Sequence, residues 1–97
     1  FRAVCEKYVA WSAREPGCLY YGFSFDGDLA HCREGFIDAN ALLAHLENLR
    51  PILHEMVEVS QWIRIEVHGP AQALTMLKEP LARLNPQWFE LEFGYRK

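Results

Sequence analysis

The most regular pattern of hydrophobic and polar positions follows a Glu-Pro-Gly turn at residues 15–17, which is typical of the end of a helix. Large apolar side chains then alternate with smaller or polar ones over residues 18–25, as in a strand with one face in a core. Residues 26–28 have hairpin-turn chemistry, and residues 29–37 alternate again. We therefore predict a β-hairpin whose first strand has one face made of Leu19, Tyr21, Phe23 and Phe25.

Helical periodicity surrounds this hairpin. Residues 1–15 place apolar side chains on one face of a helix. Asp38 suits the N-cap of a second helix, because its carboxylate can accept from free N–H groups. Residues 52–57 predict a short helix, and residues 70–84 predict another that Pro80 divides in two. The apolar stripe expected for the second helix consists of Ala39, Leu42, Leu43 and Leu46.

Two further strands are expected, a long one over residues 57–68 and a last one over residues 87–95. The order is then helix, strand, strand, helix, strand, helix, strand. One more strand before Phe1 would start the chain as βαββαβ, the order of a ferredoxin-like sandwich. We predict an α+β fold with an antiparallel sheet and its first strand upstream of Phe1. The alternative is that the last strand fills the gap in the sheet.

Composition bounds the class of protein. The 97 residues suit a single domain, residues 1–97, and half of them are hydrophobic. A net charge of −3 argues against a nucleic-acid partner, and no apolar run approaches the roughly 20 residues of a membrane helix. The three cysteines lack C-x-x-C spacing, which favours buried thiols in a reducing compartment over a disulfide framework or a metal site. We expect a cytoplasmic protein.

Both faces of the predicted strands carry large side chains. Tyr20 and Tyr21 point to opposite faces, as do Trp62 and Ile63. A two-layer sandwich covers only one sheet face with helices, so the other face favours a second sheet. We predict a homodimer, and the alternative is a monomer with a few exposed aromatic side chains.

The standard catalytic signatures are absent, and the candidate chemistry therefore rests on histidines. His45 lies beside the apolar stripe of the second helix, and His54 follows that helix. Either imidazole can act as a base near neutral pH. The structural alternatives are a boundary histidine at His45 and a helix-end histidine at His54. His31 and Arg33 share a strand face and could bind an anionic oxygen or be solvated.

Aromatic side chains are the other candidates for a binding site. Tyr21 and Phe36 belong to the expected core, which can still leave a cavity between sheet and helices. Trp62 and Arg64 share a strand face that could be a dimer interface, a solvent face or a pocket. In a pocket, Trp62 would stack on a flat aromatic ligand and Arg64 would orient it.

The runs over residues 15–21 and 34–46 together resemble the antibiotic biosynthesis monooxygenase-like (ABM-like) family. The resemblance implies a dimeric α/β barrel in which polycyclic phenols or quinols react with oxygen, often without metal or flavin. Haem-degrading relatives of that family place an iron-ligating histidine near the position of His54 and a tryptophan near that of Phe36. We expect either cofactor-independent oxygenation of a small aromatic (quinol or polyketide-like) compound or one of two alternatives. These are a non-catalytic dimeric binding or scaffold protein and a haem-binding or haem-degrading protein.

Overall fold

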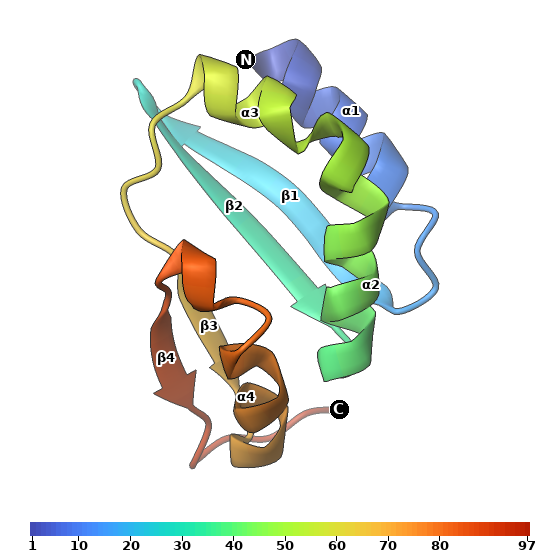
Figure 1. The fold of residues 1–97 in the computed structure, drawn as a ribbon, viewed down its shortest axis with the longest axis vertical. Helices are drawn as coiled ribbons and strands as arrows, with labels where there is room; N and C mark the ends of the chain where they lie inside the picture. The colour runs from blue at the N-terminus through green and yellow to red at the C-terminus, as the bar shows by residue number, and fades with distance from the viewer. The chain divides into compact units, whose positions relative to one another are not determined.

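A computed structural model describes all residues from 1 to 97 and shows an α+β fold compatible with a ferredoxin-like arrangement (Figure 1). The chain forms two compact units, Phe1–Gln61 and Trp62–Lys97. Each contains a two-stranded sheet with helices. None of the helices is both long and apolar enough to cross a membrane.

The predicted hairpin is confirmed. Strands β1 (Cys18–Asp26) and β2 (Leu29–Phe36) pair in antiparallel register, and Gly27 takes the positive φ of 58° that the turn needs. The register shifts between Cys18 and Tyr20. Because of this irregularity Leu19 is 47% exposed, and its predicted place on the apolar face is wrong. The helix-facing set of the hairpin consists of Tyr21, Phe23, Phe25, Ala30, Cys32 and Glu34.

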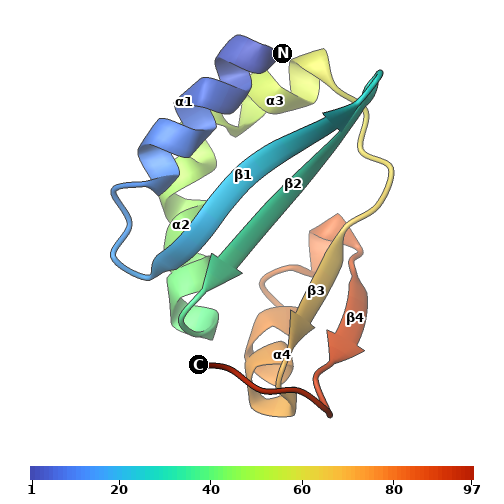
Figure 2. The same cartoon turned by 180° about the vertical axis from the view of Figure 1, so that it is seen from behind.

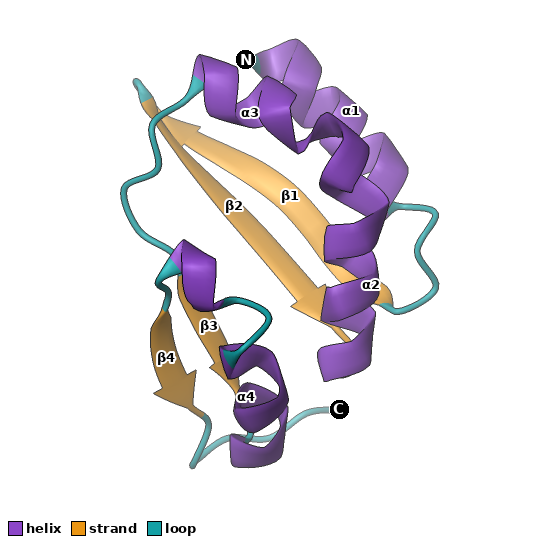
Figure 3. Ribbon diagram, viewed as in Figure 1, coloured by secondary structure: helices purple, strands orange, loops and turns teal.

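Helices α1 (Arg2–Ser12), α2 (Ala39–Leu49) and α3 (Leu53–Val59) cover one side of the hairpin (Figures 1 and 3). A view from behind shows the hairpin in front of these helices (Figure 2). A short 3-10 turn, Arg50–Ile52, joins α2 to α3. The buried core between the helices consists of Cys5, Tyr8, Leu49, Ile52 and Met56.

Two polar details belong to this core. The Tyr8 hydroxyl donates to the carbonyl oxygen of Ile52 at 3.1 Å, which joins α1 to the α2–α3 connection. The Ser12 side chain is fully buried, and its hydroxyl makes no hydrogen bond. Burial without a partner costs free energy, so Ser12 is the least satisfied polar group of the first unit.

Helix α2 begins as predicted, with the Asp38 carboxylate accepting from the Ala41 N–H at 2.8 Å. The predicted stripe is only partly right. The buried side chains of α2 are Ala39, His45 and Leu49, whereas the three leucines at 42, 43 and 46 are half-buried. The helix therefore presents a histidine to the interior where the pattern predicted leucines.

The second unit is a parallel βαβ arrangement. Strand β3 (Glu66–Gly69) leads through α4 (Ala71–Lys78) to β4 (Gln87–Glu90), which pairs with β3 in parallel. The break predicted near Pro80 is confirmed, since a 3-10 turn at Ala82–Leu84 follows α4. The buried side chains are mainly Leu74, Leu77 and Leu81.

Three predictions about the strands are wrong. Residues 57–59 end helix α3, and the strand expected over 57–68 is only Glu66–Gly69. The last strand is Gln87–Glu90 and does not reach residue 95. The pair β3–β4 is parallel, whereas the expected sheet was antiparallel, and β4 has β3 as its hydrogen-bonded neighbour. Alternation marks segments that can form strands, but a strand also needs a hydrogen-bonded neighbour. The strand expected upstream of Phe1 stays a prediction.

Candidate active site

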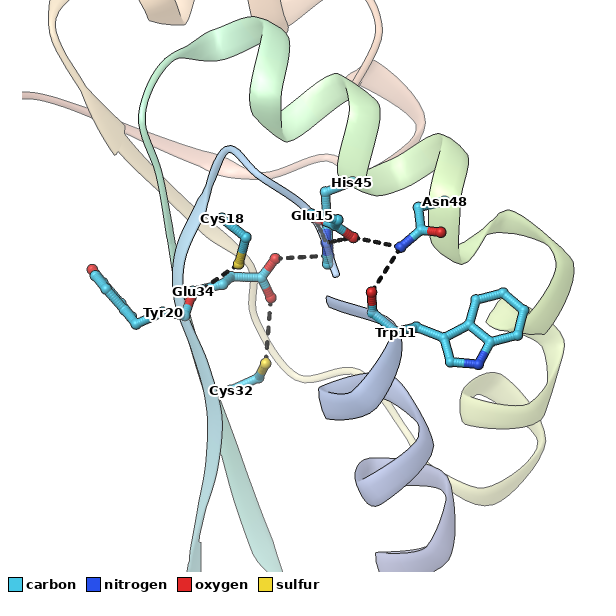
Figure 4. Close-up of polar contacts among 8 residues, drawn as sticks. All are labelled: Trp11, Glu15, Cys18, Tyr20, Cys32, Glu34, His45 and Asn48. Carbon is cyan, nitrogen blue, oxygen red and sulfur yellow. Dashed lines mark hydrogen bonds and ion pairs between the residues drawn. The ribbon is translucent and has the colours of Figure 1, made fainter. Parts of the chain in front are cut away.

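A buried histidine lies between two glutamates in the first unit (Figure 4). His45 is 2% exposed, and its Nδ1 lies 2.9 Å from both carboxylate oxygens of Glu15. On the other side of the ring, Nε2 lies 3.3 Å from Oε1 of Glu34. One imidazole thus contacts a carboxylate through each of its nitrogens, and both contacts are satisfied together only when both nitrogens carry a proton.

Glu15 is placed by the turn that follows α1. Its backbone N–H donates to the carbonyl oxygen of Ser12 at 3.0 Å, and the next two residues are proline and glycine. A Cβ at Gly17 would lie 2.5 Å from the Cβ of Ala41, so only a glycine at this position lets the turn approach α2 this closely. Gly17 does not have a positive φ, so glycine is needed there for space and not for a left-handed conformation.

Asn48 adds a second donor to Glu15. Its Nδ2 donates to Glu15 Oε2 at 2.7 Å and to the carbonyl oxygen of Trp11 at 3.1 Å. Asn48 lies one helical turn after His45 on α2, so both side chains reach the same carboxylate. With its side chain only 10% exposed, Glu15 is a largely buried carboxylate that contacts both His45 and Asn48.

Glu34 is the accessible member of the cluster. It lies on β2 opposite Tyr21, and its side chain is 33% exposed, whereas that of His45 is 3% exposed. The Cys32 thiol donates to its Oε2 at 3.3 Å. Because a carboxylate has about four acceptor positions, Glu34 can still accept from a ligand while it contacts both neighbours.

Two predicted ligand-binding residues lie against the buried imidazole. The rings of Tyr21 and Phe36 have centroids 5.3 and 4.9 Å from that of His45. Tyr21 comes from β1 and Phe36 from the end of β2, and both are half-buried. They cover the imidazole on the sheet side and keep water from its faces.

The surroundings determine which groups carry charge. Burial alone would lower the pKa of His45, but the hydrogen bonds and charges of Glu34 and Glu15 outweigh it, and the pKa is raised. Burial and then the Glu34 charge raise the pKa of the Cys32 thiol to about 12. Burial, followed by neighbouring Cys32 and Glu34, raises the pKa of Tyr21 as well. The raised pKa favours the imidazolium form of His45 between the two glutamates, beside a neutral thiol and a neutral phenol.

The other predicted site residues lie elsewhere. His54 is exposed near the start of α3 and takes no part in the cluster. Trp62 and Arg64 belong to the second unit, where both are exposed and precede β3. Arg64 Nε lies 3.0 Å from Oε2 of Glu66. Of the six residues predicted for the site, the first unit brings together His45, Tyr21 and Phe36.

An open cavity of about 380 Å³ lies along α1 and β1, and none of its lining residues is a histidine. This space between a helix and the sheet therefore touches neither of the two candidate histidines, His45 and His54. The cavity is lined by Arg2, Cys5, Glu6, Val9, Ala10, Phe23 and Phe25.

Reasoning from the sequence missed three members of the cluster, Glu15, Glu34 and Asn48. One signal was available, because Glu34 is the single acidic side chain among apolar residues on the helix-facing side of β2. An acidic residue on a core-facing strand position needs a partner. The role of Glu15 had no local signal, since a glutamate before Pro-Gly is common in turns.

These features define an α+β protein with a buried His–Glu acid–base cluster. The crystal structure of MupZ from Pseudomonas fluorescens has the same fold, with a TM-score of 0.96 and 45% sequence identity. The match covers 100% of this chain and 76% of the MupZ chain, and this chain therefore belongs to the same family as MupZ. No family model matches the chain, and no curated protein matches it.

Proposed function

We propose that this protein is an acid–base enzyme acting on a small organic molecule, with Glu34 as the proton acceptor. The observation that carries the proposal is the His45 imidazole, held 2.9 Å from Glu15 and 3.3 Å from Glu34. A paired histidine and carboxylate in partial burial is the arrangement expected for general acid–base catalysis. A purely structural histidine needs one partner, whereas this imidazole has a carboxylate on each side.

The roles within the cluster follow from exposure. His45 is too buried to touch a substrate, so our expectation that it is the base itself is revised. Glu34 can reach a substrate hydroxyl and take its proton. The substrate oxygen gains negative charge as it loses this proton, and the nearby imidazolium stabilises that charge by its positive charge without touching the substrate, while Glu15 keeps the imidazole oriented through Nδ1.

The substrate class follows from the family resemblance. A quinol or polyketide-like phenol carries a hydroxyl whose deprotonation prepares an electron-rich anion for reaction with O₂. Transfer of that proton to Glu34 is the step that the cluster can supply, and the half-buried Tyr21 and Phe36 are the nearest aromatic side chains. We therefore keep cofactor-independent oxygenation of a small aromatic compound by an ABM-like enzyme as the specific form of the proposal.

The alternatives receive less support. A non-catalytic scaffold predicts histidines that point to solvent, which fits His54 but not His45. The haem alternative relied on His54, and this exposed residue stands apart from the buried cluster. The homodimer remains a proposal. We assign the dimer interface to the outer face of the hairpin, where Tyr20 is 51% exposed and lies beneath the Arg33 guanidinium. Sedimentation equilibrium tests this assignment by measuring the mass of the protein in solution.

The proposed function is tested with a panel of quinols and polycyclic phenols, followed by O₂ uptake and absorbance. We expect turnover by the wild-type protein and a loss of about 10²–10⁴-fold in Glu34→Gln, because removal of a general base costs that much. Glu47→Gln is the matched control, since Glu47 is an exposed glutamate of α2 outside the cluster. A Glu34→Gln variant with the wild-type rate would contradict the proposal.

A further inference from the structure

We propose that Asn48 is a positioning residue: it holds the Glu15 carboxylate against His45 and thereby fixes the imidazole toward Glu34. The catalytic consequence rests on the proposed function, but the positioning itself does not. Asn48 contributes no group to the accessible side of the cluster. It acts through Glu15, at 2.7 Å, and is itself anchored at 3.1 Å to the carbonyl oxygen of Trp11 (Figure 4).

The orientation of the Asn48 amide is determined by its two neighbours. Both are acceptors, a carboxylate oxygen of Glu15 and the backbone oxygen of Trp11, and Nδ2 carries two protons. Rotating the amide by 180° would replace both hydrogen bonds with contacts between oxygens. The amide therefore has a single orientation that keeps both hydrogen bonds, one to Glu15 and one to the Trp11 carbonyl oxygen.

Anchoring matters because Glu15 lies in a turn and not in a helix or strand. Its side chain would otherwise be held by His45 alone within the first unit. The Trp11 oxygen belongs to the last turn of α1, so Asn48 ties the turn to two helices at once. A continuous chain of polar contacts runs from Trp11 through Asn48, Glu15 and His45 to Glu34.

The groups that face His45 come from three elements. Glu15 approaches from the turn after α1, Tyr21 from β1, and Glu34 and Phe36 from β2. Cys32 contacts Glu34 from the same strand. Only the two glutamates carry charge, so the protonation of His45 depends on how firmly they are held against it.

The experiment measures the titration of His45 by NMR in wild type, Asn48→Ala and Asn48→Leu. Without the Asn48 donors, Glu15 is free to move away from Nδ1 of His45. Burial, which lowers the pKa of His45, is then opposed by fewer contacts that raise it. We expect the pKa of His45 to fall toward or below its ordinary value of 6.5 in both variants. Asn40→Ala is the matched control, because Asn40 is an exposed residue of the same helix, and it leaves the titration unchanged.

An unchanged His45 titration in folded Asn48→Ala or Asn48→Leu protein overturns the inference. Leucine keeps the branched shape of asparagine, so this variant serves if the alanine variant does not fold. Hydrogen exchange of the wild-type Asn48 side-chain amide is the measurement that needs no variant. Slow exchange relative to Asn40 supports the inference, and equal exchange overturns it.

Activity separates this inference from the proposed function. If the His45 pKa falls in the Asn48 variants while the wild-type protein turns over no phenol or quinol, the positioning role stands and the proposed function fails. If both hold, the limb of the kcat–pH profile that follows His45 moves with the NMR titration in Asn48→Ala. A purely structural role would change the fraction of folded protein without moving that limb.

Discussion

Two histidines of this protein lie at the same distance from a glutamate, in different surroundings. His45 Nδ1 lies 2.9 Å from Glu15, and His68 Nε2 lies 2.9 Å from Glu66. The His45 side chain is 3% exposed, whereas that of His68 is 62% exposed and stacks on Phe89 with ring centroids 4.6 Å apart. Distance alone therefore does not distinguish a candidate active site from a surface contact.

The difference lies in the medium around the charges. Water and salt screen an exposed pair, and its two side chains lose rotamer freedom when they meet, so the net gain is small. A buried pair is screened far less, but it must offset the cost of desolvation with further hydrogen bonds. For the buried pair, Asn48 and Glu34 supply these further contacts. Removing one member of the pair leaves the charge of the other without its partner.

The largest expected effect is therefore on stability. His45→Ala leaves the largely buried Glu15 carboxylate without its imidazole, and we expect a loss of about 3–5 kcal/mol in the free energy of unfolding. His68→Ala, at the exposed pair, is expected to cost about 0.5 kcal/mol or less. Urea unfolding followed by far-UV circular dichroism compares the two. Equal losses would remove the distinction between the sites.

A smaller effect is expected at the turn that carries Glu15. Gly17→Ala introduces a Cβ that would lie 2.5 Å from the Cβ of Ala41, and because that Cβ is attached directly to the α2 backbone, the turn or α2 must shift. Overpacking of this kind costs about 1–3 kcal/mol. Gly22→Ala is the control, because a Cβ at Gly22 meets nothing within 4 Å. A Gly17→Ala variant as stable as Gly22→Ala would show that the turn tolerates displacement.

The pH dependence of stability gives a further, smaller difference. Because the folded-state pKa of His45 is raised, its contribution to stability is fully present below pH 6.5 and is lost as pH rises through the raised value. Thermal unfolding across this range should show that loss in wild type and in His68→Ala. His45→Asn should lack it, and persistence of the same loss in that variant would assign it to another group.

The smallest effect concerns salt. The screening length falls from about 10 Å at 0.1 M salt to about 3 Å at 1 M. Any loss of stability in His68→Ala should shrink over that range, since its pair with Glu66 is exposed. The loss in His45→Ala should persist. A salt-sensitive His45→Ala effect would mean that the cluster is wetter than its 3% exposed histidine indicates.

Local patterns predicted the fold where local chemistry decides it. The hairpin follows from alternation and the Asp-Gly-Asp turn, and the N-cap at Asp38 from a single side chain. The strand expected over residues 57–68 failed because the pattern contains no information about a neighbouring strand. Residues 57–59 continue a helix instead, with Val57 and Val59 exposed.

The candidate site was predictable in part for the same reason. His45, Tyr21 and Phe36 were recognised because each stands out within its own element. Glu15 and Asn48 acquire a role only when the turn after α1 packs against α2, which is a tertiary event. His54 lies eight positions after the stripe residue Leu46, a spacing that would place both on one face of a continuous helix. The fold nevertheless leaves His54 exposed.

The thiol beside the site has a practical consequence. With its pKa raised to about 12, the Cys32 thiol is almost entirely protonated at pH 7, and the thiolate is the reactive form. Burial also raises the pKa of Cys5 and Cys18. All three cysteines should therefore react slowly with alkylating agents and oxidants. We expect the folded protein to form no disulfide bonds between molecules when it is stored without a reductant.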